Sequence, residues 1–280
     1  MIARRSFLVT GAAFAISPLG VRASVPPRYT LLGSKEQGSL VIGKADGLSS
    51  VKLDGKLLSV SSRGAFAFGL EYKQTDPARL VLKFADGETQ RADIAPVVRT
   101  YDIQRIDGLP EKYVSPPEEI VKRIQRENAM VAAVRKADSD GIGFAEPFLW
   151  PAKGIMSGVF GSQRILNGDP KSPHFAVDIA APEGTPIIAP ADGVVVLAEP
   201  DFYLTGGTTV LDHGHGVFTS YSHQNELQVK VGDRIAQGSQ IGLVGKKGRA
   251  TGPHLHWGMN WFQVRLDPSR STAAPAPERL

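Results

Sequence analysis

The sequence predicts a mainly β protein of 280 residues, built from a small N-terminal β unit, one linking helix and a C-terminal all-β unit. Three observations support this class. Short runs of alternating apolar and polar residues fill the first third of the chain, as in half-buried strands. A helix-start signal precedes apolar residues at helical spacing near position 120. Histidines in the last third are spaced two residues apart, or four from an aspartate, and both spacings place side chains on one face of a strand.

Residues 1–23 have the pattern of an export signal. Arg4 and Arg5 give a charged start, residues 7–19 are largely apolar, and Val21-Arg22-Ala23 resembles a small-residue cleavage site. The apolar stretch is shorter than the roughly 20 residues that span a bilayer. We therefore expect a periplasmic or secreted protein with no transmembrane segment in the mature chain. The arginine pair also fits a twin-arginine signal, so both export routes remain open.

The charge balance gives no support to nucleic acid binding. The formal net charge is +4, and removing the signal takes away Arg4, Arg5 and Arg22 with no acidic residue, which leaves +1. No basic stripe is interleaved with aromatic residues. The chain has no cysteine, so apolar burial without disulfides must stabilise it.

Residues 24–110 are expected to form a small antiparallel β-sandwich. Asp54-Gly55 and Asp86-Gly87 are typical hairpin turns. An Ig-like topology is one form that such a sandwich takes. The expected strands lie at 39–42, 51–53, 56–60, 65–68 and 80–84. No catalytic cluster occurs here, so the unit would hold or orient the rest, and a wall-binding module is the alternative.

Residues 111–145 are expected to form a helical linker. Ser115-Pro116-Pro117-Glu118 combines a capping box with prolines at the first helical positions, and predicts a helix over about 116–137. Residues 146–268 would form the C-terminal domain. The tail, 269–280, is rich in Ala and Pro and is predicted to be disordered.

The C-terminal domain carries the chemical signal. His174 and Asp178 would project from one face of a strand, and His254 and His256 from one face of another. Two imidazoles and one carboxylate are a common ligand set for catalytic zinc, which keeps a fourth position open. All six histidines lie between His174 and His256. The sequence therefore predicts one zinc ion per chain.

A second pair of histidines receives a different interpretation. His213 and His215 are flanked by glycines in Asp212-His213-Gly214-His215-Gly216. The glycines predict a solvated hairpin turn between two strands, where rigid metal ligation is not expected.

Residues 150–268 resemble the lysostaphin-like zinc metallopeptidases, which cut peptide bonds in bacterial peptidoglycan. The resemblance lies in Val159-Phe160-Gly161-Ser162-Gln163-Arg164, His174-x-x-x-Asp178, Tyr221-Ser222-His223 and Gly252-Pro253-His254-Leu255-His256. Ala176 departs from the family's usual glycine. The resemblance implies that His174, Asp178 and His256 bind zinc while His223 and His254 act as catalysts. It leaves open which of the two catalysts is the general base.

The resemblance also implies a substrate class, namely the stem peptides of peptidoglycan. A periplasmic enzyme would meet directly joined stems, so D,D cross-links are the expected bonds and glycine bridges the alternative. Arg164 is a candidate substrate-binding residue, because a guanidinium matches a carboxylate bidentately.

Two other function classes remain as alternatives. One is a non-catalytic activator of another cell-wall hydrolase, which would be expected to lack some ligands. The other is a carrier module, because segments 229–233 and 238–242 resemble turns of biotinyl and lipoyl domains. Protein partners and oligomeric state are not indicated by the sequence.

Overall fold

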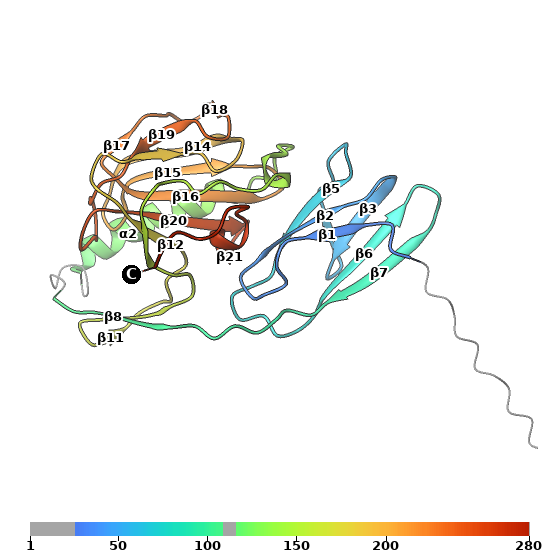
Figure 1. Ribbon diagram of the computed structural model, residues 1–280, viewed down its shortest axis with the longest axis horizontal. Helices are drawn as coiled ribbons and strands as arrows, with labels where there is room; N and C mark the ends of the chain where they lie inside the picture. The colour runs from blue at the N-terminus through green and yellow to red at the C-terminus, as the bar shows by residue number, and fades with distance from the viewer. Residues whose placement is uncertain (1–25, 109–115, 280) are drawn as a thin grey trace, which may run out of the picture.

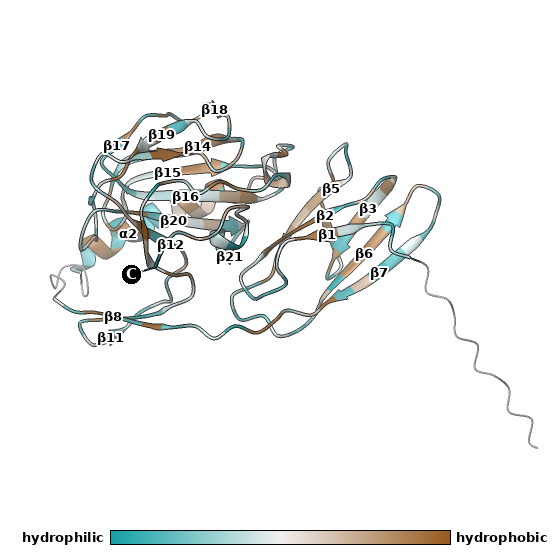
Figure 2. Cartoon of the chain, in the orientation of Figure 1, coloured by the Kyte–Doolittle hydropathy of each residue, from teal (hydrophilic) through white to brown (hydrophobic). Residues whose placement is uncertain are grey.

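The computed structural model describes residues 26–108 and 116–279, so the predicted export signal lies outside the described residues. Strands form two β units, which lie on the right and the left of Figure 1. The mainly β class is confirmed. Hydrophobic colours run along central strands of the C-terminal unit in Figure 2, as expected for strands buried within a sheet.

The N-terminal unit consists of two antiparallel sheets. One has the order β1-β2-β5 and the other the order β4-β3-β6-β7. Alternate residues of β6 are buried, which is the period-two pattern of a strand with one face on the core. The Ig-like topology stays a prediction. The strands are β1 (Thr30–Leu32), β2 (Leu40–Lys44), β3 (Leu48–Leu53), β4 (Lys56–Leu58), β5 (Ala65–Gly69), β6 (Ala78–Phe84) and β7 (Thr89–Ile94).

The C-terminal unit is built around one large sheet with the order β18-β14-β15-β16-β20-β12-β9, and β21 pairs with β20. A smaller sheet has the order β13-β19-β17. The strands are β9 (Ile155–Gly158), β12 (Val177–Ala180), β13 (Pro186–Ile188), β14 (Gly193–Phe202), β15 (Gly206–Asp212), β16 (Val217–Gln224), β17 (Glu226–Leu227), β18 (Arg234–Ile235), β19 (Gln240–Leu243), β20 (His254–Trp261) and β21 (Val264–Leu266). Two short 3₁₀ helices are η1 (Gly143–Ala145) and η2 (Pro268–Arg270).

A third small sheet is formed by segments from both parts of the chain. Strand β8 (Ile103–Ile106) follows the N-terminal unit in sequence, but it pairs in parallel with β10 (Gln163–Leu166), which also pairs with β11 (Asp169–Pro170). In Figure 1 the chain leaves the N-terminal unit and runs along the lower edge of the molecule to β8. The expected end of the N-terminal unit near residue 110 therefore falls after a strand that belongs to the C-terminal unit.

Helix α2 (Glu118–Val134) packs on the large sheet. Val131 and Val134 contact a buried cluster that includes Leu197 and Phe218. The apolar stripe of the helix therefore packs on the C-terminal unit of the same chain. Pro117 is the N-cap residue, and it makes no side-chain capping bond. The prolines therefore precede the helix, which begins two residues later than the spacing predicts.

The two units share buried contacts. Leu40 and Ala67 of the N-terminal unit belong to the same apolar cluster as Trp257 and Leu266. The backbone amide of Asp267 donates to the carbonyl of Gly38 at 2.7 Å. A side chain on Gly69 would meet Leu266 within 2.9 Å, so this glycine permits close packing.

The C-terminal tail makes hydrogen bonds to the second unit where its composition predicts disorder. Met156 N donates to Glu278 O at 2.8 Å, and Phe148 N donates to Ser271 O at 3.0 Å. The indole of Trp150 also donates to Ala274 O, so backbone and side-chain bonds together hold the tail against the second unit.

Candidate metal centre

The centre lies where β12, β16 and β20 run side by side in the large sheet. Asp178 on β12 is directly opposite His256 on β20, and His256 is opposite Ser222 on β16. His254 stands two residues before His256 and therefore shares its face. The strand assignments for Asp178, His223, His254 and His256 are confirmed.

His174 differs from its expected position because it lies before β12, in the connection from β11. Backbone bonds hold it there: His174 N donates to Ser162 O at 2.8 Å, and Gly161 N donates to His174 O at 2.7 Å. The loop brings its ring to the Asp178 carboxylate. The sequence predicts that His174 and Asp178 lie on one face of the same strand. The His174 ring instead reaches Asp178 through the loop.

The three candidate ligands converge on one point. Asp178 Oδ1 lies 3.1 Å from His174 Nε2 and 2.8 Å from His256 Nδ1, and the two nitrogens are 3.1 Å apart. Ligand atoms of a tetrahedral zinc site with bonds of about 2.0 Å are separated by about 3.3 Å. Among the described residues, this is the one group of three or more potential ligand side chains placed for a metal ion. The donor set and its spacing fit zinc.

The protonation states also suit metal binding. His174 Nδ1 lies 3.2 Å from the Val159 carbonyl, which requires a proton on Nδ1, and in the neutral ring the lone pair is then on Nε2, the atom that faces Asp178. Burial lowers the pKa of His256 to about 4, so this ring is neutral near pH 7. Burial alone would raise the pKa of Asp178, but neighbouring His174 and His256 hold it well below its usual value.

His223 and His254 flank the ligands. Their ring centroids are 4.6 Å apart, and His223 lies 5.8 Å from the His256 ring. His223 Nδ1 is 2.7 Å from Lys247 O, and His254 Nδ1 is 2.9 Å from Gly252 O. A carbonyl can only accept, so each Nδ1 carries a proton, and in the neutral ring the lone pair is then on Nε2.

His223 is held in an unusual conformation. Its φ is +64°, a left-handed value that residues other than glycine rarely adopt. Burial, together with the nearby His256 and His254, lowers the pKa of His223 to about 3. A local backbone cost at a neutral, buried imidazole is typical of a functional position.

Arg164 lies beside the candidate metal ligands. Its Nη2 donates to Asp178 Oδ2 at 3.1 Å, and its Nε donates to Gln104 Oε1 at 3.3 Å. Arg164 also lines a cavity of about 220 Å³ together with Asp178, His223 and His254. The arginine expected from the sequence to contact substrate thus also bonds to the candidate ligand Asp178.

Sequence reasoning missed Gln104 and Ile106, which line this cavity from β8. No motif surrounds them. Their place depends on the pairing of β8 with β10, which joins residues about 60 positions apart in the chain.

His213 and His215 form a turn as predicted, but the turn is buried rather than solvated. Their exposed fractions are 1% and 4%. His213 Nδ1 lies 2.7 Å from Asp192 O, and its Nε2 accepts from Thr219 Oγ1 at 2.6 Å, while His215 Nδ1 donates to Ser59 O. Phe144 and Phe148 pack on these rings. The prediction failed because the segment before β9 folds over the turn, a contact that local sequence does not reveal.

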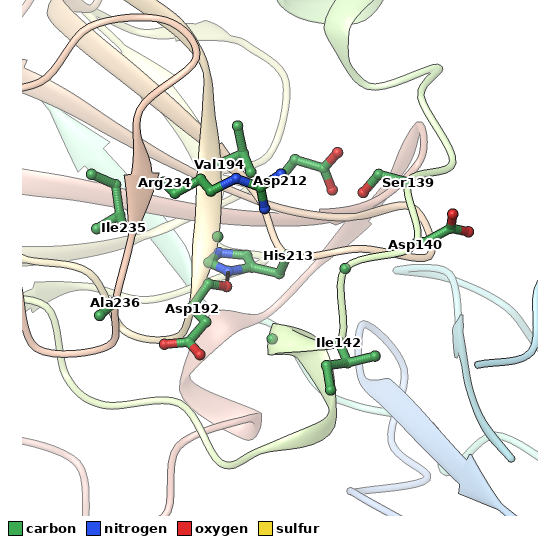
Figure 3. Close-up of a pocket in the computed structure, with 13 residues that line it drawn as sticks. Ser139, Asp140, Ile142, Asp192, Val194, Asp212, His213, Arg234, Ile235 and Ala236 are labelled. Atoms are coloured by element: carbon green, nitrogen blue, oxygen red, sulfur yellow. Dashed lines mark hydrogen bonds between the residues drawn. The ribbon is translucent and has the colours of Figure 1, made fainter. Parts of the chain in front are cut away.

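A larger cavity, about 690 Å³, opens beside this turn, at the end of β16 opposite His223. Figure 3 shows Asp192, Asp212 and Arg234 around the His213 ring. Both nitrogens of His213 are already used in hydrogen bonds. The ring is therefore a structural element of the turn.

Comparison with known proteins agrees with the geometry. Residues 172–268 match the model for Peptidase family M23. The chain is 43% identical to the peptidoglycan DD-endopeptidase ShyA of Vibrio cholerae over 86 residues. This aligned segment covers 31% of this chain and 20% of ShyA. It is 39% identical over 106 residues to the DD-carboxypeptidase/endopeptidase Mpg of Neisseria gonorrhoeae, covering 38% of this chain and 24% of Mpg. The chain thus spans a quarter or less of the length of these relatives.

The similarity to one solved structure extends over both units. A Pseudomonas aeruginosa protein assigned to peptidase M23 superposes with a TM-score of 0.67 at 28% identity, covering 87% of this chain and 97% of that chain. The two-unit arrangement is therefore shared with that protein.

Proposed function

Because the C-terminal part of this chain carries a lysostaphin-like peptidase family M23 domain, we propose that the protein is a zinc endopeptidase that hydrolyses peptide cross-links of peptidoglycan. The observation that carries this proposal is the convergence of His174, Asp178 and His256, with the free Nε2 atoms of His223 and His254 beside them. A non-catalytic activator has no need of this complete set.

His174, Asp178 and His256 would hold one zinc ion per chain. Zinc in such a site polarises a substrate carbonyl and lowers the pKa of bound water to about 7. Arg164 and the Val159 carbonyl would orient the ligands Asp178 and His174, and groups of this kind commonly change metal affinity when lost.

His254 is proposed as the general base and His223 as the group that stabilises the oxyanion. His254 Nε2 lies 3.9 Å from Asp178 Oδ1, close enough to take a proton at the metal centre and return it to the leaving amine. His223 is more deeply buried, and because its Nδ1 proton is held by Lys247 O it would donate to the oxyanion through Nε2 once that nitrogen takes up a proton, which the developing negative charge favours.

The proposed substrate is the D,D cross-link between stem peptides. Arg164 and Arg249 both line the cavity, and a guanidinium there would bind a stem-peptide carboxylate. The names of the two curated relatives point to the same class of bond.

The proposed location is the periplasm or cell exterior, reached through the predicted signal at residues 1–23. In residues 26–108 and 116–279, none of the helices has the length and apolar character needed to cross a membrane.

The test offers purified cross-linked muropeptide dimers and a pentaglycine peptide in parallel, with the His254→Ala variant as a matched control. We expect monomers from the dimers by mass spectrometry, intact pentaglycine, and little turnover by the variant. Conversion of pentaglycine alone would contradict the D,D assignment. Conversion of neither would contradict peptidase activity on these bonds and favour the activator role.

A further inference from the structure

The connector strand β8 is built into the C-terminal unit through its backbone. The carbonyls of Asp102 and Ile106 accept hydrogen bonds from Gln163 N at 2.8 Å and Asn167 N at 2.9 Å. These bonds bracket a four-residue parallel register in which Arg164 is opposite Gln104. A bonded register of this length fixes which side chains of β8 face the metal centre.

The N-terminal unit holds the start of this connector. Tyr101 Oη donates to Tyr72 O at 2.8 Å, and Tyr72 Oη donates to Gly161 O at 2.9 Å, just before β10. The two tyrosine rings lie 4.3 Å apart. Gly161 has a φ of +86°, and a side chain there would collide with Tyr101, so only glycine allows this close approach.

The side chains of β8 divide between two faces. Gln104 and Ile106 line the cavity that contains Asp178, His223 and His254. Ile103 falls on the other face and is 61% exposed. The same short strand therefore carries one isoleucine that faces the cavity, Ile106, and one that faces solvent, Ile103.

The face of β8 toward the cavity combines apolar and cationic groups. Ile106, Leu166 and Pro253 line it, and Arg164 and Arg249 line it as well. Gln104 Oε1 accepts from Arg164 Nε, while the same guanidinium donates to Asp178. This surface suits a peptide that carries an apolar side chain next to a carboxylate.

We propose that β8 is one wall of the substrate groove, in which Ile106 contacts an apolar side chain of the stem peptide and Gln104 positions Arg164. The inference rests on the proposed function for the substrate class. The N-terminal unit then has a definite role, because it anchors the strand that completes the groove.

The first test measures the dissociation constant of a cross-linked muropeptide dimer in the His254→Ala background, where turnover is suppressed. Adding Ile106→Ala should weaken binding by about tenfold, since a lost apolar contact in a pocket has an effect of this order. Ile103→Ala is the matched control, and it should change binding by less than about twofold. Zinc content and the thermal midpoint, measured in parallel, identify variants that fail to fold.

The second test concerns Gln104 in the same background. Gln104→Leu keeps the size of the side chain but removes the acceptor for Arg164, and it should weaken dimer binding severalfold. Gln104→Glu keeps an acceptor oxygen and should restore binding. Equal binding by the leucine and glutamate variants would show that Gln104 does not act through Arg164.

The outcomes separate this inference from the proposed function. Equal effects of Ile106→Ala and Ile103→Ala, or no dimer binding at all, would overturn the wall assignment. If Ile106→Ala weakens binding but the parent protein cleaves no dimer, β8 would still be a wall of the binding groove. The proposed peptidase activity would then be contradicted.

Discussion

At the residue scale, backbone carbonyls orient three of the four imidazoles around Asp178. His174 directs Nε2 to Asp178 because Val159 O holds its Nδ1. His223 and His254 are held in the same way by Lys247 O and Gly252 O, but their rings stand beside the ligand group rather than in it. The three rings share the same kind of backbone partner, so their distance from Asp178 is what distinguishes the proposed ligand from the two proposed catalysts.

Loss of either flanking imidazole should remove activity and leave the metal. We expect His254→Ala and His223→Ala to lower kcat by about 100-fold or more, because general acid–base help is commonly worth 10² to 10⁴. Initial rates on muropeptide dimers would measure this. A variant with a nearly unchanged rate would remove that histidine from the mechanism.

At the element scale, β9 makes room for the carboxylate of Asp178. Gly158 on β9 is opposite Asp178 on β12. A Cβ at position 158 would lie 2.5 Å from Asp178 Oδ2 and 3.0 Å from its Cγ. The strand register thus requires the smallest residue where the Asp178 side chain passes.

Gly158→Ala should displace Asp178 and weaken zinc binding by about 10- to 100-fold, the usual range for groups that support a ligand. Competition with a chromophoric chelator would measure the affinity. Ile155→Ala on the same strand is the control, because Ile155 is 41% exposed and should leave the affinity unchanged. Equal affinities for the two variants would show that the sheet adapts around Asp178.

Much of the site could be predicted from short-range spacing. His254 and His256 lie on one strand, so alternation alone puts them on one face. Gln104 and Ile106 could not be predicted, since their position depends on a pairing across about 60 residues and on the tyrosine contacts that anchor β8. The burial of His213 escaped prediction for the same reason, because the covering segment comes from another part of the chain.

At the scale of the whole molecule, the two units are joined by polar contacts between largely buried side chains. Arg99 Nη1 lies 2.9 Å from Asp267 Oδ2, with 15% and 3% of the two side chains exposed. Arg99 also donates to Gln37 O at 3.2 Å. This pairing places the start of the connector against the end of β21, so we expect the units to unfold together.

Arg99→Ala should lower the free energy of unfolding by about 2 kcal/mol, because the buried carboxylate of Asp267 would lose its nearest cation and keep only Ser269 and the more distant Arg270. Denaturant unfolding followed by tryptophan fluorescence would measure it. Arg28→Ala removes an exposed pairing with Asp86 and Glu88 and should matter much less. Two separate transitions in the parent protein would contradict a shared cooperative unit.

The central claim is that His174, Asp178 and His256 bind a zinc ion. His223 and His254 act in catalysis beside the ion without binding it. The most direct measurement is the zinc content of the folded protein, purified without chelator, and of the five single alanine variants. The account predicts one zinc per chain in the parent, His223→Ala and His254→Ala proteins, and almost none in the other three. A folded parent without zinc, or a His254→Ala protein as empty as His256→Ala, would contradict it.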